Sequence, residues 1–231
     1  MPRLLTALAE WMSCIVIIML MERRWSKKIT VVLHLFFGMV MIQLHYCAYT
    51  VTSIEGVSRE VQFYKWLLGM TVCMFMMLFY IRICTRGSFH MAVGGWSIAF
   101  VAAEFAASAE WQVSSALLTS RSMKDESVIV VMVCVFAVMF AGVYYGEKKI
   151  YDNLKQIDWG QSVILALLAL LAMVISNVGF QKLVWQEQES LQITLSSIRT
   201  LVDFGALASM YLIQRLHLEH EMQMEMILIN H

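Results

Sequence analysis

The sequence predicts an all-α membrane protein, a polytopic bundle of seven transmembrane helices with the N-terminus outside and the C-terminus inside. Three observations predict this fold class. Hydrophobic residues make up 60% of the 231-residue chain and charged residues only 15%, whereas a globular domain carries about 25% charged residues. Seven apolar runs are long enough to cross a bilayer, which takes roughly 20 residues. Lys and Arg are unequally divided between alternate connections, as the positive-inside rule describes.

The predicted helices follow one another along almost the whole chain. In order they are Leu4–Met21, Ile29–Thr52, Gln62–Cys84, Phe89–Trp111, Val128–Tyr145, Gln161–Trp185 and Leu191–Gln214. The first run is short and resembles a signal peptide, but its strong charge follows the apolar stretch and no A-x-A-like cleavage site appears. We therefore expect an uncleaved first helix. Aromatic rings that favour the headgroup region, or that pack between helices, lie near several predicted ends: Trp25, Trp66, Trp111, Tyr144, Tyr145, Tyr151, Trp159 and Trp185.

The orientation is predicted from the cations in the connections. One set of connections holds ten of them: Arg23, Arg24, Lys27, Lys28, Arg82, Arg86, Lys148, Lys149, Lys155 and Arg215. The opposite set holds six: Arg3, Arg59, Lys65, Arg121, Lys124 and Lys182. Cytoplasmic loops carry the excess of Lys and Arg, so the first set is predicted to be cytoplasmic. The expected location is the bacterial cytoplasmic membrane.

The only proline is Pro2. Transporters commonly interrupt helices with Pro or paired Gly so that unwound backbone can coordinate substrate. The sequence offers Gly94-Gly95 and isolated glycines for this purpose, so the helices are predicted to be largely continuous. This weighs against a transporter and favours a bundle whose helices shift or rotate as rigid bodies.

No cofactor and no metal site are expected from the cysteines and histidines. The five cysteines fall within or at the ends of helices without C-x-x-C spacing, so we interpret them as small packing residues. His34 and His45 lie about three turns apart on one face and are expected to hydrogen-bond neighbouring helices. His217 and His220 are interpreted as part of a solvated tail.

The chain is predicted not to be an enzyme. G-x-S-x-G, H-E-x-x-H and phosphate-binding glycine loops are all absent from the sequence. The formal net charge is zero, which gives no indication of nucleic-acid binding.

Ionisable residues inside predicted spans are the candidate functional residues, because each costs a few kcal/mol to place there. Arg199 and Asp203 are four residues apart on one helix face and can pair. Glu104 lies at a similar depth, and Lys182 near a helix end can extend to the interface. Two interpretations stay open. Arg199–Asp203 is a self-contained ion pair that orients its helix, or these residues line a polar pocket open to the outside.

The segment after Gln214 contains no helix breaker. Leu218, Met222, Met226 and Ile229 fall at four-, four- and three-residue steps and form one apolar stripe. The stripe either continues the last helix into the cytoplasm, where it pairs with a second copy, or lies on the inner headgroups.

The region Ile198–Tyr211, followed by Gln214 and by Glu219, Glu221 and Glu225, resembles the end of the membrane sensor in GHKL-type bacterial sensor histidine kinases, which include relatives of the peptide-pheromone receptor kinases. The resemblance implies a sensor of six or seven helices followed by a cytoplasmic dimerisation helix. On this basis residues 1–214 are expected to form a transmembrane sensor domain and residues 215–231 the start of a signalling helix.

The chain departs from that family in one respect. The family places its phospho-acceptor His in a later helix and follows it with an ATP-binding domain, and neither is found here. His231 is terminal and lacks a following acidic residue. The chain is therefore expected to be a truncated kinase or a stand-alone sensor that neither binds ATP nor transfers phosphate.

The leading hypothesis is a sensor module of a two-component-type receptor. It would detect an extracellular peptide or small amphiphile, act as a homodimer in the lipid bilayer, and use Glu104, Arg199, Asp203 and Lys182 for ligand binding or signal coupling. The alternatives are a small multi-pass transporter or permease component and a non-catalytic scaffold.

Overall fold

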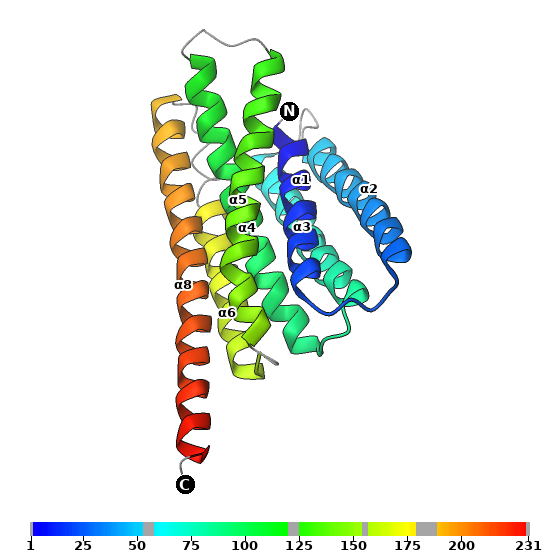
Figure 1. Ribbon diagram of the computed structural model, residues 1–231. Coiled ribbons are helices and arrows are strands. Elements are labelled where there is room, and N and C mark those ends of the chain that lie inside the picture. The colour runs from blue at the N-terminus through cyan, green and yellow to red at the C-terminus, as the bar shows by residue number, and fades with distance from the viewer. Residues whose placement is uncertain (1, 53–57, 120–124, 154–156, 179–188, 230–231) are drawn as a thin grey trace.

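The computed structural model describes residues 2–52, 58–119, 125–153, 157–178 and 189–229. Within these ranges the chain forms seven α-helices and one π-helical segment, without a β-strand (Figure 1). The elements are α1 (Pro2–Leu20), α2 (Lys27–Thr52), α3 (Arg59–Cys84), α4 (Phe89–Thr119), α5 (Asp125–Asn153), α6 (Trp159–Ala172), η1 (Met173–Val178) and α8 (Glu189–Ile229). The predicted all-helical architecture is confirmed.

Five of the described helices are long and apolar enough to cross a membrane. Their apolar portions are Lys27–Ala48, Glu60–Cys84, Phe89–Ser115, Ile129–Tyr151 and Trp159–Ser176. Helix α1 contributes a shorter apolar stretch, Leu5–Leu20. Helix α8 is not among the five, and it carries Arg199 and Asp203 within its length. The number of spans therefore stays a prediction, whereas a helical membrane-embedded bundle is supported.

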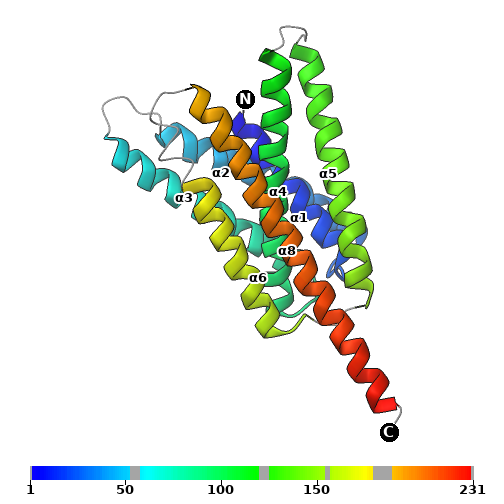
Figure 2. The same cartoon turned by 90° about the vertical axis from the view of Figure 1, so that its left-hand side faces the viewer.

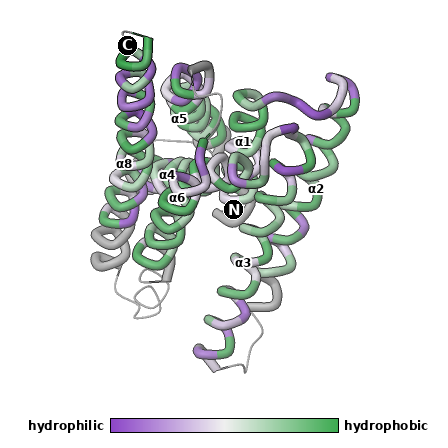
Figure 3. Tube along the Cα trace, turned by 90° about the horizontal axis from the view of Figure 1, so that it is seen from below, coloured by the Kyte–Doolittle hydropathy of each residue, from purple (hydrophilic) through white to green (hydrophobic). Residues whose placement is uncertain are grey.

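The outward faces of the helices are apolar, which indicates that hydrocarbon surrounds them. Most residues of α2 and α6 are hydrophobic, as the green colour of their tubes in Figure 3 shows. The exposed large side chains include Val32, Leu35, Leu68, Phe75, Phe79, Val138, Leu167 and Leu171. A soluble monomer rarely exposes apolar patches larger than a few hundred Å². In a bilayer the same faces would contact hydrocarbon, where a helix is stable because it satisfies its own backbone hydrogen bonds.

Helix α4 is the centre of the bundle. It packs against α1, α3, α5, α6 and α8, and its side chains are buried without interruption from 94 to 104. Small residues allow this close packing, since they let helix backbones approach one another. At Gly95 an added Cβ would lie only 2.8 Å from Ile17 Cγ2 of α1. The close approach of α1 to α4 thus requires glycine at position 95, because any side chain there would collide with Ile17.

The connections at one end of the bundle are bound to each other. Arg24 N donates to Cys84 O (2.9 Å), and Arg86 N donates to Glu22 O (2.9 Å). These bonds join the α1–α2 connection to the α3–α4 connection. The N-terminus of α6 lies at the same end, where Ser162 Oγ donates to the carbonyl oxygen of His90 (2.7 Å). Several of the connections predicted to be rich in cations therefore gather at one end, and the C-terminal part of α8 leaves the bundle there (Figure 1).

Helix α8 is longer than a bilayer is thick. Its 41 residues span about 61 Å at 1.5 Å per residue, against roughly 30 Å of hydrocarbon. It lies against α4, with α6 and α5 on either side, and its last turns project beyond the bundle (Figure 2). The chain after Gln214 thus continues the last helix without a break to Ile229.

One expectation about helix continuity was wrong. The sequence predicted an uninterrupted helix over Gln161–Trp185, but α6 ends at Ala172 and passes into the π-helical segment η1. Ser176 in η1 is buried, and its hydroxyl donates back to Ala172 O (2.6 Å). Such back-bonding by serine is associated with bent helices. Residues 179–188 lie outside the described ranges.

Replacing Gly95 by Val is expected to destabilise the bundle by about 1–3 kcal/mol, the usual effect of overpacking a core. The added methyl groups would collide with Ile17. The measurement is thermal unfolding of the detergent-purified protein. Gly205→Val is the matched control, because a Cβ at Gly205 meets nothing within 4 Å. Equal unfolding temperatures for both variants would contradict the proposed α1–α4 contact.

Candidate functional site

Three of the four predicted site residues meet where α8 crosses α4. Arg199 Nη2 donates to Glu104 Oε2 in a direct ion pair between the two helices. Arg199 Nε lies 3.9 Å from Asp203 Oδ2, one turn along α8. The guanidinium therefore stands between two carboxylates, and both pairings considered from the sequence are present. Lys182, the fourth residue, lies outside the described residues.

Hydroxyl and amide groups extend this contact. Ser108 Oγ donates to Asp203 Oδ2 (3.2 Å), and Gln112 Nε2 donates to Thr200 Oγ1 (2.9 Å). We refer to the set below as the polar interface. It consists of Glu104, Ser108 and Gln112 of α4 and Arg199, Thr200 and Asp203 of α8. The π-helical segment η1 packs against α8, and Ser176 lies near the Asp203 carboxylate, so this segment borders the same site.

The polar interface is buried and carries a formal charge of −1 when its three ionisable groups are charged. The side chains of Glu104 and Asp203 are only 2% and 1% exposed, and that of Arg199 is 18% exposed. Electrostatic attraction is stronger in this low-dielectric setting than in water. Removing one partner of a buried pair leaves a charge that nothing compensates. The interface therefore binds α8 to α4, and its excess negative charge can accept a cationic group.

An apolar groove adjoins the polar interface. The groove lies between helices α4, α5 and α8 and has a volume of about 320 Å³. The lining residues are Phe105, Val138, Met139, Gly142, Val143, Gly146, Glu147, Phe204, Leu207, Ala208 and Tyr211. Phe105 and Phe204 directly follow Glu104 and Asp203 in the chain. A Cβ at Gly142 would meet nothing within 4 Å, so α5 leaves space beside α8. The groove has the volume and lining to receive an apolar group.

The sequence contained a signal for the polar interface that charge alone did not reveal. Glu104, Ser108 and Gln112 recur every four residues in α4, which places them on one face. The prediction selected only the glutamate. The prediction also missed Glu147, near the C-terminal end of α5. Its carboxylate accepts a hydrogen bond from Gln214 Nε2 of α8 (3.5 Å).

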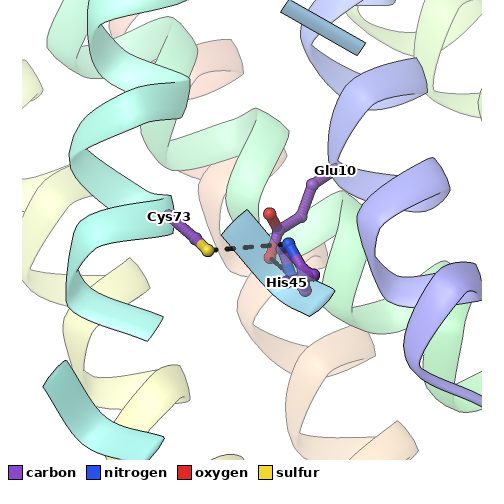
Figure 4. Close-up of side chains that lie close together, drawn as sticks. All are labelled: Glu10, His45 and Cys73. Atoms are coloured by element: carbon purple, nitrogen blue, oxygen red, sulfur yellow. Dashed lines mark hydrogen bonds and ion pairs between the residues drawn. The ribbon is translucent and has the colours of Figure 1, made fainter. Parts of the chain in front are cut away.

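A second cluster lies between α1, α2 and α3 (Figure 4), and α2 and α3 are on the side of the bundle away from α8 (Figure 1). His45 Nε2 is 3.4 Å from Glu10 Oε1, and His45 Nδ1 is 3.5 Å from Cys73 Sγ. All three side chains are buried. The prediction that His34 and His45 hydrogen-bond neighbouring helices is confirmed, since His34 bonds the hydroxyl of Tyr80. Glu10 and Cys73 were not singled out from the sequence.

The comparisons with known proteins add no relative. No family model, curated protein or solved structure matches this chain. The similarity of Ile198–Tyr211 to GHKL sensor regions accordingly stays a prediction from the sequence.

A double-mutant cycle on Glu104→Gln and Arg199→Gln is expected to give a coupling free energy of at least about 1 kcal/mol, because the two side chains share one buried ion pair. The measurement is the free energy of unfolding in detergent. Glu110→Gln is the control partner for Arg199→Gln, since buried Glu110 accepts from Ser114 within α4. Additive effects in the Glu104 cycle would contradict the α4–α8 ion pair.

Proposed function

We propose that this chain is the membrane sensor region of a signalling receptor, which detects an extracellular cue and transmits it through α8 to a cytoplasmic helix. One observation carries the proposal. Helix α8 contains the buried ion pair with α4 and also continues unbroken to Ile229, beyond the bundle. A change at the polar interface can therefore reach the projecting end of the same helix without passing through a connection.

The proposed topology has seven spans, with the N-terminus outside. The connections at the end from which α8 projects carry Arg23, Arg24 and Arg86, and the C-terminal turns of α5 carry Lys148 and Lys149. Segments rich in Lys and Arg remain cytoplasmic. Counting α8 as a span requires burying two charges. Both face α4 and each other rather than lipid, as intramembrane ionisable residues generally do.

Signal transmission requires two packings of α8 that the cue distinguishes, since a ligand shifts an equilibrium only through its differential affinity. In one packing the polar interface is closed. In the other, α8 moves toward the groove beside Gly142. A cue with a cationic group next to an apolar group fits the excess negative charge and the neighbouring apolar lining. A peptide or small amphiphile has that chemistry.

The projecting end of α8 supports a homodimer. Leu218 packs against Ile150 of α5, but Met222, Met226 and Ile229 on the same stripe are exposed. Pairing of two such stripes would bury them, in the manner of a short coiled coil. Ion pairs Arg215–Glu219 and His217–Glu221 lie along the exposed helix surface.

Cysteine cross-linking in membranes should detect this dimer. Met222→Cys and Met226→Cys are expected to form intermolecular disulfides in a background in which the other cysteines are replaced by Ser. Met224→Cys is the matched control, because it is equally exposed but lies on the opposite face of the helix. Cross-linking at all three positions alike, or at none, would contradict pairing through the stripe.

The signalling role is tested by joining a GHKL-type kinase core after residue 231. Each residue inserted at the junction rotates the core by about 100° relative to α8, so autophosphorylation is expected to vary with helical phase. Glu104→Gln should shift the basal activity, and the control Glu110→Gln should not. Autophosphorylation that changes neither with the helical phase of the junction nor with Glu104→Gln would exclude transmission through α8.

Filling the groove provides a second readout in the same fusion. Gly142→Leu is expected to hold α8 in one packing and to remove the effect of Glu104→Gln on kinase activity, because the space beside α8 is then occupied. Gly205→Leu is the control, since its site is open but does not line the groove. An unchanged response in Gly142→Leu would show that α8 does not use the groove.

A transporter component is the second candidate, and η1 favours it. Interrupted helices next to buried charges form substrate sites in transporters, and Ser176 of η1 borders Asp203. Cysteine accessibility distinguishes the two functions. Labelling of Ser176→Cys from both faces of the membrane would favour a transporter, and labelling from the outside alone would favour a receptor.

A further inference from the structure

We propose that Glu10, His45 and Cys73 form a binding site for a transition-metal ion of the zinc class, which joins α1, α2 and α3. The site is separate from the polar interface, so this proposal does not depend on the signalling role of α8. Each helix contributes one donor, and the three ligand atoms lie within 4.8 Å of one another.

The distances approach those of a tetrahedral site. Zn–S is about 2.3 Å and Zn–N and Zn–O about 2.0–2.2 Å, which sets ligand atoms roughly 3.3–3.6 Å apart. His45 Nε2 and Glu10 Oε1 are 3.4 Å apart, within this range, and one ligand atom from each of the three residues lies within 4.8 Å of the others. The three side chains point toward one another from three different helices (Figure 4).

The orientation of His45 suits a metal ligand. Its Nδ1 lies 3.1 Å from the carbonyl oxygen of Met41. An Nδ1–H that donates to this carbonyl leaves Nε2 as the metal ligand, and Nε2 is the nitrogen next to Glu10. Metal-binding histidines commonly hold their second nitrogen against a backbone carbonyl in this way.

Glu10 provides a second, independent observation. It is completely buried, and neither carboxylate oxygen makes a hydrogen bond to the residues that the structure describes. Among the residues that the structure describes, Glu10 forms an ion pair with His45. A buried carboxylate in this state is costly. A divalent cation bound to one carboxylate, one thiolate and a neutral imidazole gives a net charge of zero in the apolar core.

The donor set selects the metal. Thiolate and imidazole suit zinc, cobalt or copper rather than magnesium or calcium, which prefer oxygen ligands. Three protein ligands leave a fourth position for water or another donor. The ion would hold together the three helices that pack around the cluster.

Titration of the metal-free, detergent-purified full chain with Co²⁺ tests the proposal. One Co²⁺ per chain should bind and produce a thiolate-to-cobalt charge-transfer absorption. Cys73→Ser should abolish this absorption, whereas Cys84→Ser should retain it, because Cys84 is a buried free thiol at the end of the same helix. Glu10→Gln and His45→Gln should weaken binding by more than about tenfold, and His34→Gln should not.

A second measurement guards against misfolded variants. Zn²⁺ should slow the reaction of Cys73 with a small thiol reagent in the otherwise unchanged chain, and should not slow the reaction of Cys84. Absence of the charge-transfer absorption at saturating Co²⁺, or equal protection of both thiols, would overturn the proposal. The cluster would then be a metal-free Glu10–His45 ion pair beside a thiol.

Discussion

The arrangement of this bundle depends on one buried ion pair, Glu104 of α4 with Arg199 of α8. Helix α4 is surrounded by other helices and has little freedom to move. Helix α8 carries Arg199 and Asp203, whose charges are costly in an apolar environment, and Arg199 pairs with Glu104 of α4 and with Asp203. Asp203, Ser108 and the other groups of the polar interface complete the contact. Helix α8 is thus held to α4 by electrostatics at the polar interface, and its neighbouring turns line the apolar groove.

The two halves of the bundle differ in how they are held. Helices α1, α2 and α3 are joined by the Glu10–His45–Cys73 cluster and by backbone bonds between their connections. Helices α1 and α3 pack directly against α4. On the other side, α5 and α8 leave the apolar groove between them. Movement of α8 against a fixed remainder is the form of change that this asymmetry permits.

Much of the fold could be predicted because hydrocarbon allows few solutions. Apolar length located the helices, and the rarity of charges in spans identified Glu104 and Arg199. The rest could not be predicted from local patterns. Which helices are neighbours depends on tertiary packing, and Glu10, His45 and Cys73 are too far apart in the chain for any spacing rule. The π-helical turn contains neither Pro nor Gly to mark it, and serine and glutamine are too common in helices to stand out.

The charges of α8 also constrain how the protein is assembled. Placing Arg or Asp at the centre of a single inserted helix costs about 2.5–3.5 kcal/mol each. The compensating carboxylate of Glu104 belongs to a helix that is synthesised earlier. In the proposed seven-span topology, α8 would enter the bilayer at low cost only while α4 is already there and its side next to α8 is still uncovered. Glu104 is synthesised before Arg199, so assembly in this topology would require the nascent helices to remain together until α8 has been made.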